Sequence, residues 1–166
     1  VALRMGEGFL KITGEVGTGK TLICRKLLNT LSDEGMVTAY IPNPYLTPSA
    51  LRYSLAEELG VEYPMNIGGH RALQLIYNRL ITLKAEGRQV ILLLDEAQAL
   101  PEETLEAIRL LTNLETEKSK LLQVVLFGQP ELDEHLERPS VRQLKQRITF
   151  SHAIHALNPE GCRGYI

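Results

Sequence analysis

The sequence predicts an α/β domain built around a parallel sheet with helices on both faces. Strand-like and helix-like segments alternate along the chain, and a glycine-rich loop joins the first strand to the first helix. One continuous apolar run, at 90–94, has the length of a strand. The chain has 166 residues, 44% hydrophobic and 23% charged, which is the composition of a soluble globular domain with a sizeable core.

Hydrophobic patterns give the expected elements in chain order. We expect strands at 8–13, 36–41, 89–95, 120–127 and 148–154. We expect helices at 21–31, 49–59, 70–86 and 101–114, and two short helices at 130–136 and 140–146. The third strand has the strongest pattern, because an uninterrupted apolar run is typical of a central parallel strand that is buried on both faces.

The glycine-rich loop after the first strand is the most informative motif. Residues 14–21 read GEVGTGKT and fit the spacing G-x-x-x-x-G-K-[ST]. Glycines let the backbone curl so that its N–H groups face phosphate oxygens, and the next helix turns its positive end to the same anion. Lys20 would place a charge near the β- and γ-phosphates, and Thr21 would ligate Mg²⁺. The residues assigned to nucleotide binding are Gly14, Glu15, Val16, Gly17, Thr18, Gly19, Lys20 and Thr21.

An acidic pair, Asp95 and Glu96, follows the third strand. The carboxyl ends of parallel strands face the crevice where α/β sheets bind ligands. Asp95 is therefore expected to hold Mg²⁺, and Glu96 to orient and deprotonate the water that attacks the γ-phosphate. An isolated acidic pair would more simply be a solvated strand end, but the phosphate loop favours the functional interpretation.

Gln129 follows the fourth expected strand. If that strand lies between the first and the third, the Gln129 amide is placed to hydrogen-bond both the γ-phosphate and the attacking water. Gln129 is thus a candidate γ-phosphate sensor. The alternative is a turn residue in front of Pro130.

One basic cluster lies near the end of the chain. We expect one of its arginines, Arg147 first and Arg142 second, to reach into the nucleotide site of a neighbouring subunit. A solvated helix face and a DNA contact are the alternatives. The cluster consists of Arg138, Arg142, Lys145 and Arg147.

Bulk features exclude several other classes of protein. The formal net charge of −2 gives no overall basic field, so we do not expect nucleic acid as a partner. Cys24 and Cys162 make no disulfide framework, and Cys24 is expected to be a small buried residue. No apolar run approaches the ~20 residues of a membrane span. His152 and His155 lack partners at metal-ligand spacing.

Taken together, four segments resemble AAA+ ATPases of the general secretion pathway protein A type, and most of all the ATPase of mannose-sensitive haemagglutinin (MSHA) pilus biogenesis. The acidic segment LLLDEAQ and the segment LFGQPEL are much narrower signals than the phosphate loop. The four segments are 14–21, 92–98, 126–132 and 142–148.

The resemblance implies a three-layer P-loop NTPase core with a five-stranded parallel sheet of order 5-1-4-3-2. It also implies hydrolysis of ATP with Mg²⁺ that drives assembly of a type IV-like pilus or secretion apparatus. Expected partners are further copies of the chain and an inner-membrane assembly protein, at the cytoplasmic face of that membrane. Carried over by motif, the catalytic residues are Lys20, Glu96, Gln129 and Arg147, and the metal ligands are Thr21 and Asp95.

Residues 1–157 are expected to form the nucleotide-binding core and 158–166 to begin a helical lid. The lid itself, which carries a second sensor arginine in such ATPases, does not follow within the sequence. Two other functions stay open. One is a nucleic-acid-linked ATPase of the transposition or replication-initiator kind, which shares this core. The other is an ATP-dependent interaction switch with little turnover.

Overall fold

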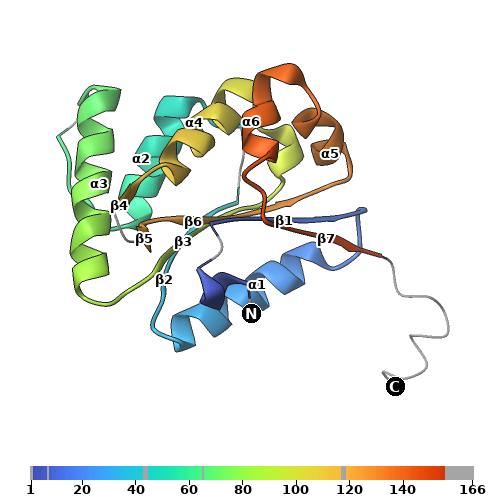
Figure 1. Cartoon of the computed structure of the whole chain (residues 1–166), viewed down its shortest axis with the longest axis horizontal. Helices are drawn as coiled ribbons and strands as arrows, with labels where there is room; N and C mark the ends of the chain where they lie inside the picture. The colour runs from blue at the N-terminus through green and yellow to red at the C-terminus, as the bar shows by residue number, and fades with distance from the viewer. Residues whose placement is uncertain (1, 7, 43–44, 65, 117–118, 156–166) are drawn as a thin grey trace.

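A five-stranded, fully parallel sheet forms the middle layer of the computed structural model (Figure 1). The structure describes residues 2–6, 8–42, 45–64, 66–116 and 119–155. The strands of the sheet are β1 (Phe9–Gly14), β2 (Val37–Ile41), β3 (Val90–Leu94), β6 (Gln123–Gly128) and β7 (Phe150–Ile154).

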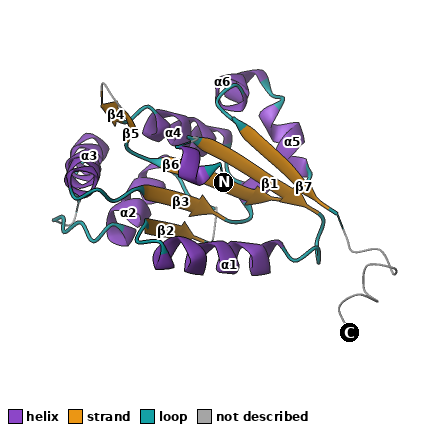
Figure 2. Cartoon of the chain, turned by 60° about the horizontal axis from the view of Figure 1, so that its bottom comes forward, coloured by secondary structure: helices purple, strands orange, loops and turns teal. Residues whose placement is uncertain are grey.

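The strands lie in the order β2-β3-β6-β1-β7. The labels β4 and β5 belong to a separate hairpin, so the sheet's own strands are, in chain order, β1, β2, β3, β6 and β7. Counted in that way from the β7 edge, the order is 5-1-4-3-2, which is the arrangement that the resemblance implies. The strand arrows all run in one direction, so their carboxyl ends share one edge (Figure 2).

Helices cover the two faces of the sheet unequally (Figure 1). Helix α1 (Lys20–Asp33) lies on one face together with the short 3-10 helix η1 (Leu3–Met5). The opposite face carries α2 (Pro48–Glu58), α3 (Gly69–Ala85), α4 (Glu102–Thr112), α5 (Glu131–Leu136) and α6 (Arg142–Lys145). Two further 3-10 turns are η2 (Ala97–Ala99) and η3 (Pro139–Val141).

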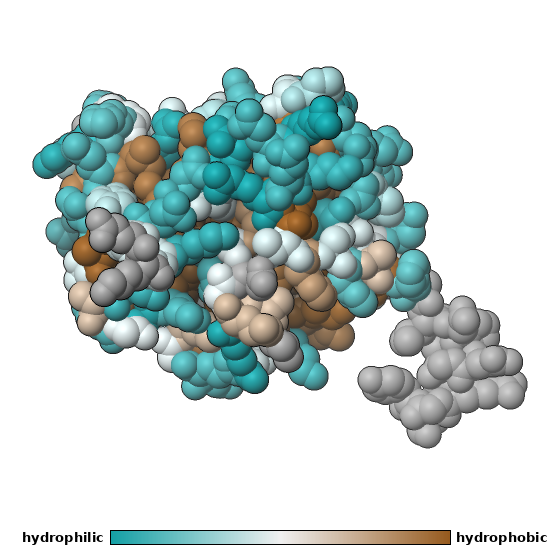
Figure 3. All heavy atoms as spheres, in the orientation of Figure 1, coloured by the Kyte–Doolittle hydropathy of each residue, from teal (hydrophilic) through white to brown (hydrophobic). Residues whose placement is uncertain are grey.

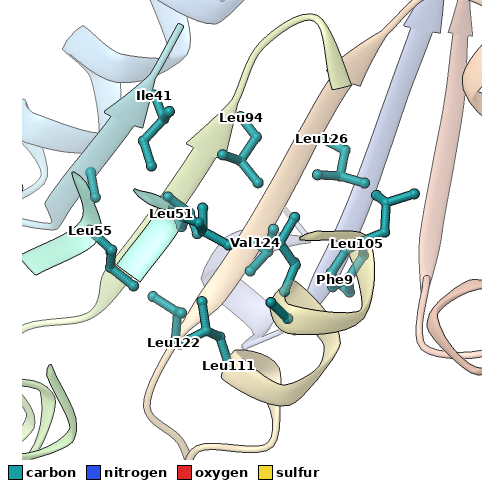
Figure 4. Packing of buried hydrophobic residues seen from close by; sticks show 14 of the residues in the cluster. Phe9, Ile41, Leu51, Leu55, Leu94, Leu105, Leu111, Leu122, Val124 and Leu126 are labelled. Carbon is teal, nitrogen blue, oxygen red and sulfur yellow. The ribbon is translucent and has the colours of Figure 1, made fainter. Parts of the chain in front are cut away.

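Two hydrophobic cores result from the alternation of side chains along the central strands. In β3, Leu92 and Leu94 point into the larger core, while Ile91 and Leu93 point toward α1. Figure 4 shows the larger core, to which the sheet contributes Leu94, Val124 and Leu126, and helix α4 contributes Leu105 and Leu111. Burial on both faces confirms the prediction for the apolar third strand.

The structure corrects several predicted bounds near the end of the chain. The expected fourth strand, 120–127, begins too early because Lys120 belongs to a hairpin of β4 (Glu115–Thr116) and β5 (Ser119–Lys120). The expected short helix 140–146 splits into η3 and α6, and the last strand begins at Phe150 instead of Ile148. The predicted lid segment 158–166 lies outside the described residues.

Pro101 was expected inside the first turn of its helix, but it is the N-cap residue of α4. Its extended backbone (φ −60°, ψ 151°) ends the preceding turn and leaves Glu102 as the first helical residue.

Hydrophilic side chains dominate the face shown in Figure 3, and apolar side chains appear between them in small groups. A search of the described residues for a helix long and apolar enough to cross a membrane finds none.

Truncation of Leu92 should destabilise the fold strongly, because this fully buried side chain is in the central layer of the larger core. We expect Leu92→Ala to lower the free energy of unfolding by about 3 kcal/mol. The matched control is Leu110→Ala on α4, whose side chain is 46% exposed and should cost about 0.5 kcal/mol or less. Urea denaturation followed by circular dichroism measures both values, and equal losses would contradict the two-core architecture.

Candidate nucleotide-binding site

All predicted site residues except Arg147 end or follow three adjacent strands, β1, β3 and β6, at one edge of the sheet. Parallel pairing puts Leu94 beside Leu126, and Thr13 beside Gly128. The segments that follow these three strands therefore lie at one edge of the sheet: the phosphate loop after β1, the acidic pair after β3 and Gln129 after β6. This edge is where open α/β sheets bind ligands.

The loop from Gly14 to Gly19 has the backbone shape that its glycines predict. Gly17 and Gly19 adopt left-handed conformations, with φ of 81° and 86°, which residues with a Cβ adopt at a cost. Helix α1 begins directly after them at Lys20, and no side chain caps its first turn. The N–H groups of that turn thus lack helical acceptors and are suited to an anion.

The side chain of Lys20 reaches back from the start of α1 into the loop. This side chain is buried, and Nζ donates hydrogen bonds to the carbonyl oxygens of Gly14 at 2.5 Å and Glu15 at 2.8 Å. The Thr18 hydroxyl donates to the same Glu15 oxygen at 2.7 Å. A Cβ at Gly14 would stand 2.6 Å from the Thr18 hydroxyl, so glycine is required at this position. The loop is thus held in its curved shape by its own side chains.

Asp95 is buried at the end of β3, with 5% of its surface exposed. Oδ1 accepts a hydrogen bond from the Glu96 N–H at 2.9 Å, and Oδ2 accepts a longer one from the Tyr40 hydroxyl at 3.4 Å. Burial, followed by the nearby Asp95 carboxylate, raises the pKa of Tyr40 to about 12, so this phenol keeps its proton at neutral pH. Thr21, the other predicted metal ligand, is exposed in the first turn of α1.

Cys24 is fully buried between α1 and the sheet, as predicted. Burial, with a smaller contribution from the Asp95 carboxylate, raises the pKa of this thiol to about 12. The thiol is therefore neutral at physiological pH and behaves as a small core residue. Cys162 lies outside the described residues.

Glu96 has the strained backbone that often marks functional residues. Its φ of 52° and ψ of 37° are left-handed, which costs a residue with a Cβ about 1–2 kcal/mol. This turn follows β3 immediately and directs the Glu96 carboxylate toward the end of β6. There, Oε2 accepts hydrogen bonds from Nε2 of Gln98 at 2.6 Å and Nε2 of Gln129 at 3.4 Å.

Gln98 is the residue that the sequence prediction missed. Besides its bond to Glu96, its Oε1 accepts a hydrogen bond from the Gln129 backbone N–H at 3.0 Å. The signal was present, because an amide can donate and accept at once and Gln98 stands two residues after the acidic pair. Its partner Gln129, directly after β6, is 31 positions away, and only the strand order reveals that contact.

Arg147 is not brought to this site. It precedes the amino end of β7, whereas the phosphate loop lies at the carboxyl end of β1, at the opposite edge of the sheet. Of the basic cluster, Arg138 pairs with Glu102 and Lys145 pairs with Glu137. Any role for Arg147 in nucleotide chemistry would therefore be performed on another subunit's site.

Comparison with known proteins gives one family and one curated relative. An AAA domain family matches residues 3–136. General secretion pathway protein A of Aeromonas hydrophila is 44% identical over 164 residues, which are 99% of this chain and 30% of that protein. The chain thus spans less than a third of the relative's length. The comparison supports the secretion-protein A type, while the closer likeness to the MSHA ATPase stays a prediction.

Solved structures share the fold at low sequence identity. ORC2 of Aeropyrum pernix, in its ADPNP–ADP complexes, has a TM-score of 0.69 at 18% identity. The match covers 99% of this chain and 46% of the ORC2 chain. Cdc6p of Pyrobaculum aerophilum has a TM-score of 0.69 at 23% identity, and the match covers 88% of this chain and 38% of the Cdc6p chain. These likenesses show the fold alone. The shared fold is the P-loop nucleotide-binding fold, and the match over residues 3–136 shows that the chain belongs to the AAA domain family.

Proposed function

We propose that this chain binds ATP with Mg²⁺ and hydrolyses it. The observation that carries the proposal is the convergence of the phosphate loop, the acidic pair and Gln129 at one edge of the sheet. A phosphate loop can bind a nucleotide without an acidic pair or an amide side chain beside it. A base beside the γ-phosphate position is what hydrolysis adds.

The residues present fit a nucleotide and its metal. The uncapped first turn of α1 and the buried Lys20 ammonium suit phosphate oxygens. Within the described residues, no three His, Cys, Asp or Glu side chains gather to hold a metal by themselves. Thr21 and Asp95 would therefore share Mg²⁺ with phosphate oxygens and water. When bound, Mg²⁺ neutralises phosphate charge.

Two side chains would act on the attacking water. Glu96 would orient the water and take its proton, and Gln129 would hydrogen-bond the γ-phosphate. The contact between their side chains supports this assignment, because a base and a phosphate sensor must lie within one hydrogen-bond network. The left-handed strain at Glu96 supports it further, since such strain persists where a side chain has to be aimed.

The cellular role we propose is assembly of a secretion apparatus or type IV-like pilus. Its support is the 44% identity with a protein named for the general secretion pathway. We propose further that copies of the chain associate when nucleotide is bound, at the cytoplasmic face of the inner membrane. There they would act with an inner-membrane protein. The position of Arg147, far from its own loop, supports action between subunits.

Among the residues that the structure describes, no contact favours nucleic acid as the partner. Two of the four cluster cations, Arg138 and Lys145, are paired with glutamates. The net charge of −2 gives no overall attraction to phosphate backbones. The interaction switch shares the nucleotide site with the proposed enzyme, and it differs from the enzyme only in turnover.

Loss of the Lys20 ammonium should remove nucleotide binding, because its charge faces the phosphate site from a buried position. We expect Lys20→Ala to weaken ATP binding at least about 100-fold, or about 2.7 kcal/mol. The matched control is Lys26→Ala, which removes an exposed lysine from the same helix. Isothermal titration with ATP and Mg²⁺ measures both affinities. Unchanged affinity in Lys20→Ala would contradict the assignment of the loop.

Replacement of the proposed base should separate binding from chemistry. Glu96→Gln keeps the shape of the side chain and removes its capacity to take a proton. We therefore expect ATP affinity within about threefold of wild type, and single-turnover hydrolysis slower by about 100-fold or more. Turnover that survives this change would refute the role of Glu96. A wild-type protein that binds ATP without measurable turnover would instead support the interaction switch.

Complementation should test whether Arg147 acts on a neighbour. Lys20→Ala lacks a working site but carries an intact Arg147, and Arg147→Ala has the converse defect. Because an arginine that enters the site of a neighbour accelerates phosphoryl transfer by about 10³–10⁵, each variant alone should be nearly inactive. A mixture should recover at least about ten times the activity of either variant alone. Absence of recovery, despite association measured by light scattering, would rule out this role of Arg147.

A further inference from the structure

We infer that Gln98 is a positioning residue, which ties the Glu96 carboxylate to the end of strand β6. The inference rests on the proposed hydrolysis, since the placement of a base matters only if that base acts on water. It gives a role to the last residue of the segment LLLDEAQ, to which the sequence analysis assigned none. It also links the end of β3, which precedes the acidic pair, to the end of β6, which precedes Gln129.

Two hydrogen bonds of opposite direction carry the inference. Gln98 donates from Nε2 to Glu96 Oε2 at 2.6 Å and accepts at Oε1 from the Gln129 N–H at 3.0 Å. One side chain thus joins Glu96, the second residue after β3, to Gln129, the residue directly after β6. An amide suits this place because it has a donor and an acceptor on one rigid plane, which a carboxylate or an ammonium lacks.

The turn that carries Gln98 is anchored on both sides. Ala97 and Leu100 are buried in the larger core. The Ala99 N–H donates to the Glu96 carbonyl at 3.0 Å, which closes the 3-10 turn η2. Gln98 therefore projects from a rigid element, as a residue that positions another side chain should.

Strand β6 leaves room for the Gln98 carbonyl. A Cβ at Gly128 would stand 3.2 Å from Oε1 of Gln98 and 3.0 Å from Cδ2 of Leu132. Both approaches are tighter than ordinary van der Waals contact. Glycine at 128 thus lets the Gln98 amide reach the Gln129 N–H.

Gln98 and Gln129 hold Glu96 unequally. The Gln98 contact to Oε2 is short, at 2.6 Å, whereas the Gln129 side-chain contact is 3.4 Å and therefore weak. If the Gln129 side chain turns toward a γ-phosphate, Gln98 still holds Glu96 through Oε2. Oε1 of Glu96 accepts no hydrogen bond from the described part of the chain, and it is the oxygen left for water.

The kinetic test uses two variants at position 98 and one control. Gln98→Ala removes both hydrogen bonds. Gln98→Glu has the same length and keeps the acceptor for the Gln129 N–H, but it replaces the donor toward Glu96 with a like charge. The control is Gln74→Ala on α3, an exposed glutamine with one 3.3 Å bond to Arg71.

We expect both Gln98 variants to lower kcat for ATP hydrolysis at least about tenfold, with KM and the ATP Kd within about twofold of wild type. A general loss of fold would change all three. Gln74→Ala should leave all three unchanged. Wild-type kcat in Gln98→Ala would overturn the positioning role alone. A wild-type protein that binds ATP without hydrolysis would overturn the proposed function, and the inference with it.

A second measurement needs no activity. Residue-resolved amide hydrogen exchange of the nucleotide-free protein reports the Gln129 N–H directly. We expect its exchange to accelerate at least about tenfold in Gln98→Ala and to stay near wild type in Gln98→Glu, which keeps the acceptor. Normal protection in Gln98→Ala would show that the link to β6 does not exist, and would overturn the inference whatever the kinetics.

Discussion

Burial of β3 and β6 on both faces is the constraint on which the site depends. Side chains of these strands alternate between two separate cores, so a slip by one residue would exchange the contents of both. The pairing of Leu94 with Leu126 is therefore fixed by packing. It also fixes where the two strands end, and so it brings Glu96, which follows β3, within reach of Gln129, which follows β6. Hydrophobic packing thus supplies the precise placement that the side chains of such a site need.

Three features at the carboxyl edge of the sheet cost the fold stability. Glu96 adopts a left-handed backbone, Asp95 is a buried carboxylate, and Lys20 is a buried ammonium. Hydrogen bonds compensate the two buried charges: two loop carbonyls accept from the Lys20 ammonium, and the Glu96 N–H and the Tyr40 hydroxyl donate to Asp95. The same bonds that satisfy these groups also orient them. Structure and proposed chemistry therefore depend on the same hydrogen bonds, among which those of Gln98 join the ends of β3 and β6.

Sequence patterns predicted the parts of this molecule that local chemistry determines. The glycine loop, the doubly buried β3 and the acidic pair follow from spacing and periodicity, and the strand order came from the family resemblance. Sequence could not place the hairpin β4–β5, because strands of two residues, Glu115–Thr116 and Ser119–Lys120, have no periodicity to detect. It missed the role of Gln98 because that role depends on Gln129, which follows a strand that is distant in the sequence. Arg147 stays a prediction, since its proposed target would be on another molecule.

The most direct test is a crystal structure with Mg²⁺ and a non-hydrolysable ATP analogue. We expect the γ-phosphate between Lys20 and Gln129, with the metal at Thr21 and Asp95. Glu96 should still accept the hydrogen bond from Gln98 and face the water in line with the γ-phosphate. A nucleotide bound away from this edge, or a Glu96 carboxylate turned out of the site with Gln98 free of it, would contradict our description of how this chain works.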